Sequence, residues 1–382
     1  MRQKNKFYTD INLINLPIFS SSKKINRSNK TEEIVLNKNG VKTKLIIQYP
    51  EEKLTFFDRK ILAGIEYLFC NLHNISSLEE AYNKEFIIQK KIFLKKFNID
   101  EDDIKQSETQ QIIFETMSVI QKEFKLYITM KDINNLIYNN TYAHSMIKKS
   151  LEKLQQTIIK QESDYFVDSS RLELLEVSLL SFSLSKTKNR DTMIVSLNPF
   201  HLVNLLKRNF YISDIKLLNS FQSSIAGRLH ELIKKALYGS KLFNKDKVVY
   251  DYKFICNYLQ VEVRNSKSLI LQQFEKPLKE LIEKKIIVNW EIQKNLFDFE
   301  ILFYHSLQYY NNFWNTLDET IQRKINFGLA QLYKDEEEYN TFNKEIEAFM
   351  ESLSFAEQEK YDNLKDFYTK YYYLQKYKIG EE

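Results

Sequence analysis

Two stretches of the chain, about 120 residues apart, repeat one pattern of apolar and polar positions. Residues 126–137 and residues 248–259 both begin with a short apolar strand and continue with a polar N-cap residue, Thr129 or Asp251. A short helix with the pattern Lys-x-Ile-x-Asn follows in both copies. Periodicity that changes after an N-cap residue predicts a strand followed at once by a helix.

A polar turn and a longer helix come next in each copy. We expect this second helix at about residues 141–159 and about residues 266–284. Helical spacing defines its buried stripes, which are Ile147, Leu151, Leu154 and Ile158 in the first copy and Ile270, Phe274, Leu278, Leu281 and Ile282 in the second. A shift of 123 residues places Ile147, Leu151 and Ile158 on members of the second stripe. Pro277 removes one backbone hydrogen bond, so we expect one bent helix there.

Alternating residues that suit a β-ribbon end each copy. In the first copy, residues 175–184 and 192–197 flank a basic tip at residues 185–190. In the second, residues 286–290 and 296–303 flank a turn at residues 293–295. Strand, helix, turn, helix and ribbon is the element order of a winged helix-turn-helix, so the pattern predicts two of them in tandem.

The remaining segments predict a hairpin and several helices. Residues 1–53 are polar and irregular and are expected to be flexible, except for a hairpin around Asn37–Gly40. A capping box formed by Thr55 and Asp58 starts a helix. Residues 73–110 are charged, helical in part and typical of an insertion, and residues 111–124 predict another amphipathic helix.

The leading helix of the second copy is expected at residues 212–237, ending near Gly239, after a short helix at residues 199–206. We therefore predict a helix-rich α+β fold with two tandem winged-helix domains. The predicted domains are a flexible segment at 1–53, a first winged-helix domain at 54–210, a second at 211–305, and an acidic helical extension at 306–382.

Composition agrees with a globular protein of two or three domains, since 43% of the 382 residues are apolar and 14% are aromatic. The two cysteines, Cys70 and Cys256, lie in apolar patterns and predict buried free thiols in a reducing cytoplasm. The first residues lack the apolar stretch of a signal peptide, and no run approaches the ~20 apolar residues that cross a bilayer. We expect a cytoplasmic protein without a membrane partner.

The net charge of +5 is unevenly distributed. Residues 306–382 carry 9 basic and 15 acidic side chains, a balance of −6, so the other residues carry 47 bases and 36 acids, a balance of +11. A basic body suits a polyanionic partner such as double-stranded DNA. The alternative is that the abundance of Lys, Asn and Ile reflects AT-rich coding alone.

The start of each longer helix is the candidate DNA-reading surface, because a helix reads base edges in the major groove from its N-terminal residues. In the first copy the candidates are Thr141, Tyr142, His144, Ser145, Lys148 and Lys149. In the second they are Arg264, Ser266, Lys267, Ser268, Gln272, Gln273 and Lys276. At the ribbon tip they are Lys186, Lys188 and Arg190. The alternative is that these residues form ordinary solvated faces.

Enzyme chemistry is not indicated. No glycine-rich loop ends in Gly-Lys-Ser or Gly-Lys-Thr, so a phosphate-cradling nucleotide site is not expected. The five histidines, His73, His144, His201, His230 and His305, are isolated and do not have metal-ligand spacing. We expect a protein that is not an enzyme and that uses no cofactor.

Four segments carry a resemblance to a known family. They are Leu54–Leu62, the basic helix Ile147–Leu154, the Pro-containing helix Phe274–Leu281, and Ser224–Leu232, which has His230 where tyrosine is usual. The chain resembles, over roughly residues 17–290, plasmid replication initiators of the replication initiator protein A family, which have two winged-helix domains. The insertion at 73–110 and the acidic extension depart from that pattern.

The resemblance implies binding to repeated sites at a plasmid origin, opening of AT-rich DNA, and recruitment of the host helicase and other replication proteins. It also implies a homodimer that represses its own promoter. Two alternatives stay open from the residues themselves. One is a transcription regulator with the same double fold, and the other is an adaptor whose winged helices contact proteins.

Overall fold

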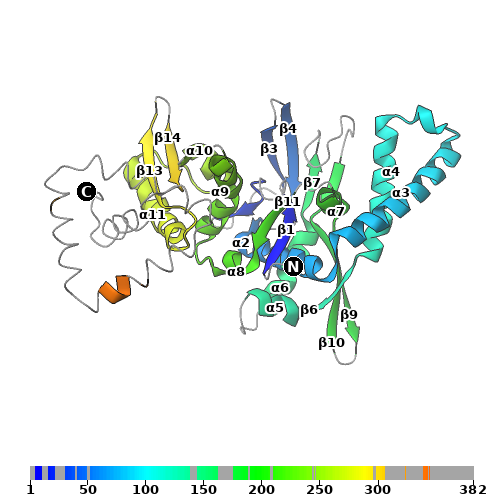
Figure 1. The fold of residues 1–382 in the computed structure, drawn as a ribbon, viewed down its shortest axis with the longest axis horizontal. Coiled ribbons are helices and arrows are strands. Elements are labelled where there is room, and N and C mark those ends of the chain that lie inside the picture. The colour runs from blue at the N-terminus through cyan, green and yellow to red at the C-terminus, as the bar shows by residue number, and fades with distance from the viewer. Residues whose placement is uncertain are drawn as a thin grey trace. The chain divides into compact units, whose positions relative to one another are not determined.

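The computed structural model describes residues 5–10, 16–21, 31–38, 41–49, 52–137, 144–161, 175–187, 190–206, 210–242, 245, 247–295, 298–305, 323, 339–342 and 344. The fold is α+β and rich in helix, with several small sheets, as predicted (Figure 1). Two compact units are present, residues 1–232 with 252–280 and residues 233–251 with 281–382. The domain limits expected from the sequence stay a prediction.

The helices of the first unit are α2 (Phe56–Leu72), α3 (Ile75–Phe97), α4 (Gln106–Glu123), α5 (Met130–Ile137), α6 (His144–Gln156), α7 (Pro199–Leu206), α8 (Ile215–Ser220) and α10 (Tyr252–Leu259). Helices α9 (Ser224–Leu242) and α11 (Lys267–Glu283) run from the first unit into the second. The strands of the first unit are β1 (Lys6–Asp10), β2 (Phe19–Ser20), β3 (Thr31–Lys38), β4 (Val41–Gln48), β5 (Leu54–Thr55), β6 (Leu126–Thr129), β7 (Ile158–Gln161), β8 (Leu175–Ser178), β9 (Leu180–Thr187), β10 (Arg190–Leu197) and β11 (Phe210–Asp214). Those of the second are β12 (Lys247–Asp251), β13 (Asn289–Lys294) and β14 (Phe299–Tyr304).

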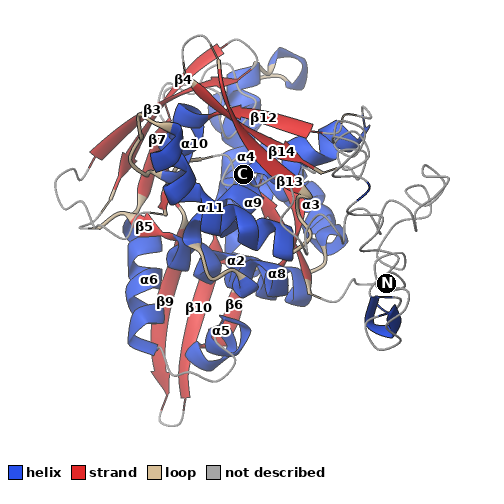
Figure 2. Ribbon diagram, turned by 90° about the vertical axis from the view of Figure 1, so that its left-hand side faces the viewer, coloured by secondary structure: helices blue, strands red, loops and turns tan. Residues whose placement is uncertain are grey.

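The repeated element order predicted from the sequence is confirmed. In the first copy β6 precedes α5 and α6 and joins an antiparallel sheet of order β6-β10-β9 (Figure 2). In the second copy β12 precedes α10 and α11 and joins a sheet of order β12-β14-β13. The strand before the two helices therefore pairs with the ribbon after them in both copies, which is the winged-helix arrangement.

The longer helix of the first copy ends earlier than predicted. Helix α6 stops at Gln156, and Ile158 begins β7, which pairs with β4 in a sheet of order β3-β4-β7-β8. The expected match of Ile158 to Leu281 is therefore wrong, whereas Ile147 and Ile270 both lie on their helices and are fully buried. Pairing with β4 supplies Ile158 with a strand environment that helical spacing alone did not indicate.

The N-terminal segment is more ordered than predicted. The expected hairpin is present as β3 and β4, but β1 pairs with β11, and Leu16, Ile18 and Phe19 are fully buried. Residues 22–30, which contain most of the expected flexible stretches, lie outside the described residues. Isolated apolar residues in a polar segment gave little periodic signal, because their partners are far away in the sequence.

The prediction of one long helix at residues 212–237 is wrong. The chain forms β11, then α8, then α9, which continues past Gly239 to Leu242. Asp214 caps α8 by accepting the N–H groups of Lys216 and Leu217. The break is held by Glu280 of α11, whose carboxylate accepts the N–H groups of Gln222 and Ser223.

The insertion at residues 73–110 is the first part of a helical hairpin made of α3 and α4, joined through a 3-10 turn at Glu101–Asp103. Helix α4 starts at Gln106, five residues before the predicted position. The outer part of the α3–α4 hairpin extends beyond the other described elements of this unit (Figure 1). We call this hairpin, residues 75–123, the arm.

The second copy has the predicted single helix α11 with Pro277 inside it. Its ribbon strands lie at Asn289–Lys294 and Phe299–Tyr304, so the first strand extends through residues 293 and 294, where the turn was expected to begin. Within the predicted C-terminal extension, the described residues 323, 339–342 and 344 are helical, and the rest lies outside the described residues.

A buried cluster of charges joins elements from both ends of the first unit. The Arg59 guanidinium of α2 donates from Nε to Oε1 of Glu231 in α9 at 2.8 Å and from Nη1 to Oε2 of Glu66 at 3.1 Å. Its Nη2 donates to the Thr9 hydroxyl of β1, which lies 2.9 Å from Glu66. Arg228 of α9 adds a second bond to Glu231. These four charged side chains have almost no exposed surface.

The segment Ser224–Leu232, which carried part of the family resemblance, supplies this cluster. Arg228 also donates to the Leu16 carbonyl at 3.0 Å, and its guanidinium lies 4.6 Å from the Tyr258 ring of α10. Gly227 permits close packing, because a Cβ there would lie 2.0 Å from the Phe56 ring of α2. The segment is therefore structural, with its charges used internally.

Burial and neighbouring charges shift the pKa values of Glu66, Glu231 and His201 in different directions. It raises the pKa of Glu66 to about 7, although Arg59 acts in the opposite direction. Burial opposes ionisation of Glu231 too, but the charges on Arg59 and Arg228 hold the pKa of Glu231 below its ordinary value. His201, 3.7 Å from Glu66, is neutral, because burial and Arg59 lower its pKa to about 3.

Replacing Glu66 with Gln is expected to change how stability depends on pH. The pKa of Glu66 is raised in the folded state. Its contribution to the free energy of unfolding is therefore complete below about pH 4.5 and is lost as the pH rises through about 7. Between pH 5 and pH 8 the native chain should lose roughly 2 kcal/mol relative to Glu66→Gln. Urea unfolding of both proteins at several pH values measures this difference.

His201 makes stability depend on pH in the opposite sense to Glu66. It is present both in the native chain and in the Glu66→Gln variant. The pKa of His201 is lowered in the folded state. Its contribution to the free energy of unfolding is therefore present above about pH 6.5 and is lost as the pH falls toward about 3. The comparison between the two proteins removes this effect. Parallel stability curves would show that Glu66 ionises like an ordinary carboxyl group.

Candidate nucleic-acid interface

The first helix-turn-helix is fixed by two acids at helix starts. Asp132 and Thr129 form a reciprocal cap at the beginning of α5, with Asp132 Oδ2 accepting the Thr129 N–H at 2.7 Å. At the start of α2, Asp58 forms the predicted capping box with Thr55 and also accepts Lys153 Nζ of α6 at 2.7 Å. This buried ion pair fixes α6 against α2, in addition to apolar packing.

Helix α6 exposes the polar face predicted for it. Ile147, Leu151 and Leu154 are fully buried, and the candidates on the other face, His144, Ser145, Lys148 and Lys149, are exposed. Acids lie beside both lysines, with Lys149 Nζ 3.1 Å from Glu52 and Lys148 Nζ 3.8 Å from Glu152. These neighbours reduce the positive field of α6, so α6 alone is a weak phosphate-binding surface.

The second helix-turn-helix is organised by the Tyr252 hydroxyl. It accepts the Arg264 N–H of the turn at 2.8 Å and donates to Oε1 of Gln273 in α11 at 2.9 Å. Gln273 in turn donates to the Glu262 carbonyl at 3.0 Å. Helix α10 ends at Leu259, and the left-handed conformation of Gln260 (φ 52°) turns the chain toward α11. Side chains thus connect both helices and the turn between them.

The first two turns of α11 present a polar face beside Leu269, which is 42% exposed. Lys267, Ser268 and Gln272 are exposed there, and the first acid of the helix is Glu275. Ser268, Gln272 and Lys276 are spaced four residues apart and share one face. The opposite face is fully buried through Ile270, Phe274 and Leu278. This face offers a cation for phosphate and an amide for a base edge, so it is the stronger of the two candidate readers.

Three predicted candidates of the second copy make contacts within the fold. Gln273 is half-buried and uses both ends of its amide within the turn, where it positions α11, and base reading by Gln273 stays a prediction. Arg264 lies in the turn, 3.0 Å from Glu262, and is half-exposed. Ser266 precedes α11, and its hydroxyl accepts the Leu269 N–H at 3.4 Å.

The predicted basic ribbon tip is only partly described. Strands β9 and β10 extend to Thr187 and Arg190, so Lys186 and Arg190 lie on paired strands close to the tip. Lys188, like Thr141 and Tyr142, lies outside the described residues. The wing therefore remains a predicted contact.

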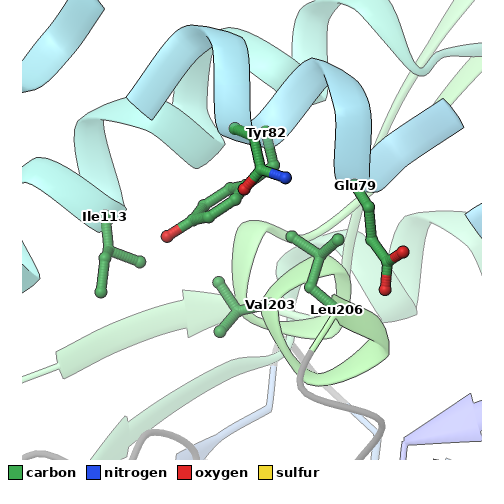
Figure 3. Close-up of a pocket in the computed structure, with 6 residues that line it drawn as sticks. Glu79, Tyr82, Ile113, Val203 and Leu206 are labelled. Carbon is green, nitrogen blue, oxygen red and sulfur yellow. The ribbon is translucent and has the colours of Figure 1, made fainter. Parts of the chain in front are cut away.

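A hollow of about 300 Å³ lies where α3 and α4 meet α7 (Figure 3). Its lining residues are Glu79, Tyr82, Asn83, Ile113, Val203 and Leu206. None of these described lining residues is cationic, so they do not offer the chemistry that binds a nucleotide phosphate.

The described residues hold no group of three or more His, Cys, Asp or Glu side chains that could bind a metal ion. Among the described helices, none combines the length and the apolar character that crossing a membrane requires.

Replacing Tyr252 with Phe is expected to loosen the turn before α11. The change leaves the Arg264 N–H and the Gln273 carbonyl oxygen without their partner, which should cost about 1–2 kcal/mol of unfolding free energy. Urea unfolding measures the loss. Tyr127→Phe is the matched control, because Tyr127 is 67% exposed on β6 and should change stability by only a few tenths of a kcal/mol. Equal effects would show that the hydroxyl does not organise the turn.

Comparisons with known proteins find few matches. No protein-family model matches this chain, and no curated protein matches it. A crystal structure of a selenomethionine derivative of domains 2 and 3 of RctB is similar, with 10% sequence identity, coverage of 77% of this chain and 97% of that chain, and a TM-score of 0.43. A second structure of RctB domains 2–3 has 8% identity, coverage of 77% and 96%, and a TM-score of 0.40.

Proposed function

We propose that this chain is a sequence-specific binder of double-stranded DNA that initiates plasmid replication, without enzymatic chemistry or a cofactor. The observation that carries the proposal is the repeated winged-helix order, in which each longer helix buries an apolar face and exposes a polar one. The basic balance of residues 1–305 supports a polyanionic partner.

In this proposal, helices α6 and α11 contribute differently to DNA binding. Lys267 of α11 contacts phosphate and contributes salt-dependent affinity by counterion release. Gln272 pairs with adenine, whose N6 and N7 atoms match a carboxamide. Helix α6, with acids beside its lysines, contributes less charge. Bending of the bound DNA would lower the cost of opening an adjacent AT-rich tract.

The plasmid setting rests on the family resemblance of residues 17–290. It implies repeated sites at an origin, a cytoplasmic location, a homodimer in autoregulation, and contacts with the host helicase. A transcription regulator with the same fold would share the DNA contacts but would not open the DNA.

Substitutions in α11 test the assignment of the two roles. We expect Lys267→Ala to reduce the slope of log K against log salt by about 0.9, the loss of one phosphate contact. Gln272→Ala should leave that slope unchanged and reduce discrimination at one base pair by about 1–3 kcal/mol. Gel-shift titrations over a salt series, with the DNA that flanks the gene and with single-base variants of its repeats, measure both.

Lys216→Ala is the matched control, because Lys216 is an exposed lysine on α8. It should change neither the slope nor the base preference. The proposal fails if the chain does not bind the flanking DNA at low salt, and the assignment of α11 fails if both α11 variants behave like Lys216→Ala.

Opening of DNA separates an initiator from a transcription regulator. On a supercoiled plasmid that carries the flanking repeats and an AT-rich tract, the chain should make thymines of that tract reactive to permanganate, because bending and wrapping destabilise the duplex there. A plasmid with the repeats but a GC-rich tract is the control. Tight binding without new thymine reactivity would favour the regulator.

A further inference from the structure

The arm carries a surface that the proposed DNA contacts do not use. On the outer face of α3, three isoleucines are exposed, Ile87 by 55%, Ile88 by 41% and Ile92 by 52%. Lys84, Lys91 and Lys95 are exposed among them. At 100° per residue these six side chains share one side of the helix. We call them the Ile-Lys stripe.

Among the described residues, the stripe is not part of the packing that holds the arm together. The hairpin contact uses the other side of α3, where Leu78 and Phe93 are buried. Aromatic pairs, Tyr82 with Phe86 and Phe93 with Phe97, strengthen that inner side. The outer isoleucines are β-branched and so are poor choices for an exposed helix on propensity alone. Grouped exposed apolar residues of this kind mark an interaction surface.

The charges around the Ile-Lys stripe indicate which kind of partner can bind it. A second copy placed on the same stripe would oppose lysine with lysine, which is repulsive. DNA or an anionic membrane would extend past both ends of the stripe and meet exposed acids, Glu80 at one end and Asp100 to Asp103 at the other. A short acidic segment avoids these acids, because the stripe from Lys84 to Lys95 is only about 17 Å long.

We propose that the Ile-Lys stripe of α3 docks an acidic amphipathic helix of another protein, about three turns long. Apolar side chains at positions i, i+3, i+4 and i+7 of that helix cover the isoleucines, and its flanking carboxylates face the three lysines.

A designed peptide tests the proposal with the full chain. The probe is a fluorescein-labelled 18-residue peptide with leucines on one helical face and glutamates beside them, and its control has the same composition with the leucines scattered. Fluorescence anisotropy should show at least about tenfold tighter binding of the amphipathic peptide. Ile87→Ser combined with Ile88→Ser should abolish this preference. Ile212→Ser is the control, because Ile212 is 51% exposed on β11.

A charge exchange keeps the test independent of folding defects. The triple variant Lys84→Glu, Lys91→Glu and Lys95→Glu should lose the acidic peptide and gain a peptide in which lysine replaces glutamate. Misfolding cannot produce that gain. Lys216→Glu should not change the preference of the chain for the acidic peptide.

Three results would overturn the proposal. They are equal binding of the amphipathic and scattered peptides, binding that the stripe variants leave unchanged, and binding of phosphatidylglycerol-containing vesicles through the stripe without binding of the peptide. Gel shifts with the flanking DNA, in which the stripe variants should match the native chain, keep this outcome separate from the proposed DNA-binding function.

Discussion

The buried ion-pair cluster of Arg59, Arg228, Glu66 and Glu231 is the constraint on which the first unit depends. Four charges without solvent are stable only when each has partners, and losing one partner from such a set typically costs about 3–5 kcal/mol. The partners here come from β1, α2 and α9, and Arg228 also contacts the Tyr258 ring of α10. The cluster therefore ties the first winged helix to the first helix of the second copy.

The two copies share a core pattern and differ on the surface. Ile133 and Ile255, like Ile147 and Ile270, occupy equivalent buried positions and are fully buried. The exposed faces diverge, with two lysines next to acids on α6 and an acid-free start on α11. Duplicated cores with different polar faces suit two units that contact different stretches of one ligand, which is the basis of the proposed DNA-binding function.

Local patterns predicted the elements that depend on local interactions. The strand–helix starts at Thr129 and Asp251, the capping box at Thr55, the hairpin of β3 and β4, and the single helix across Pro277 follow from short-range chemistry. Predictions failed where a distant residue decides the outcome. Glu280 caps the backbone that breaks the long helix expected at 212–237, and pairing with β4 ends α6 before Ile158.

The sequence by itself determined the α+β class, the repeated winged-helix order and the polar faces of α6 and α11, because apolar periodicity and capping act over a few residues. The tertiary structure alone decided which polar residues are available to a ligand. Gln273 and Arg228 have suitable chemistry for nucleic acid, yet their side chains are used inside the fold. The isoleucines of α3 fit a helical pattern, but only packing of its other face against α4 leaves them exposed. Burial is a property of contacts between distant segments, and no local pattern contains it.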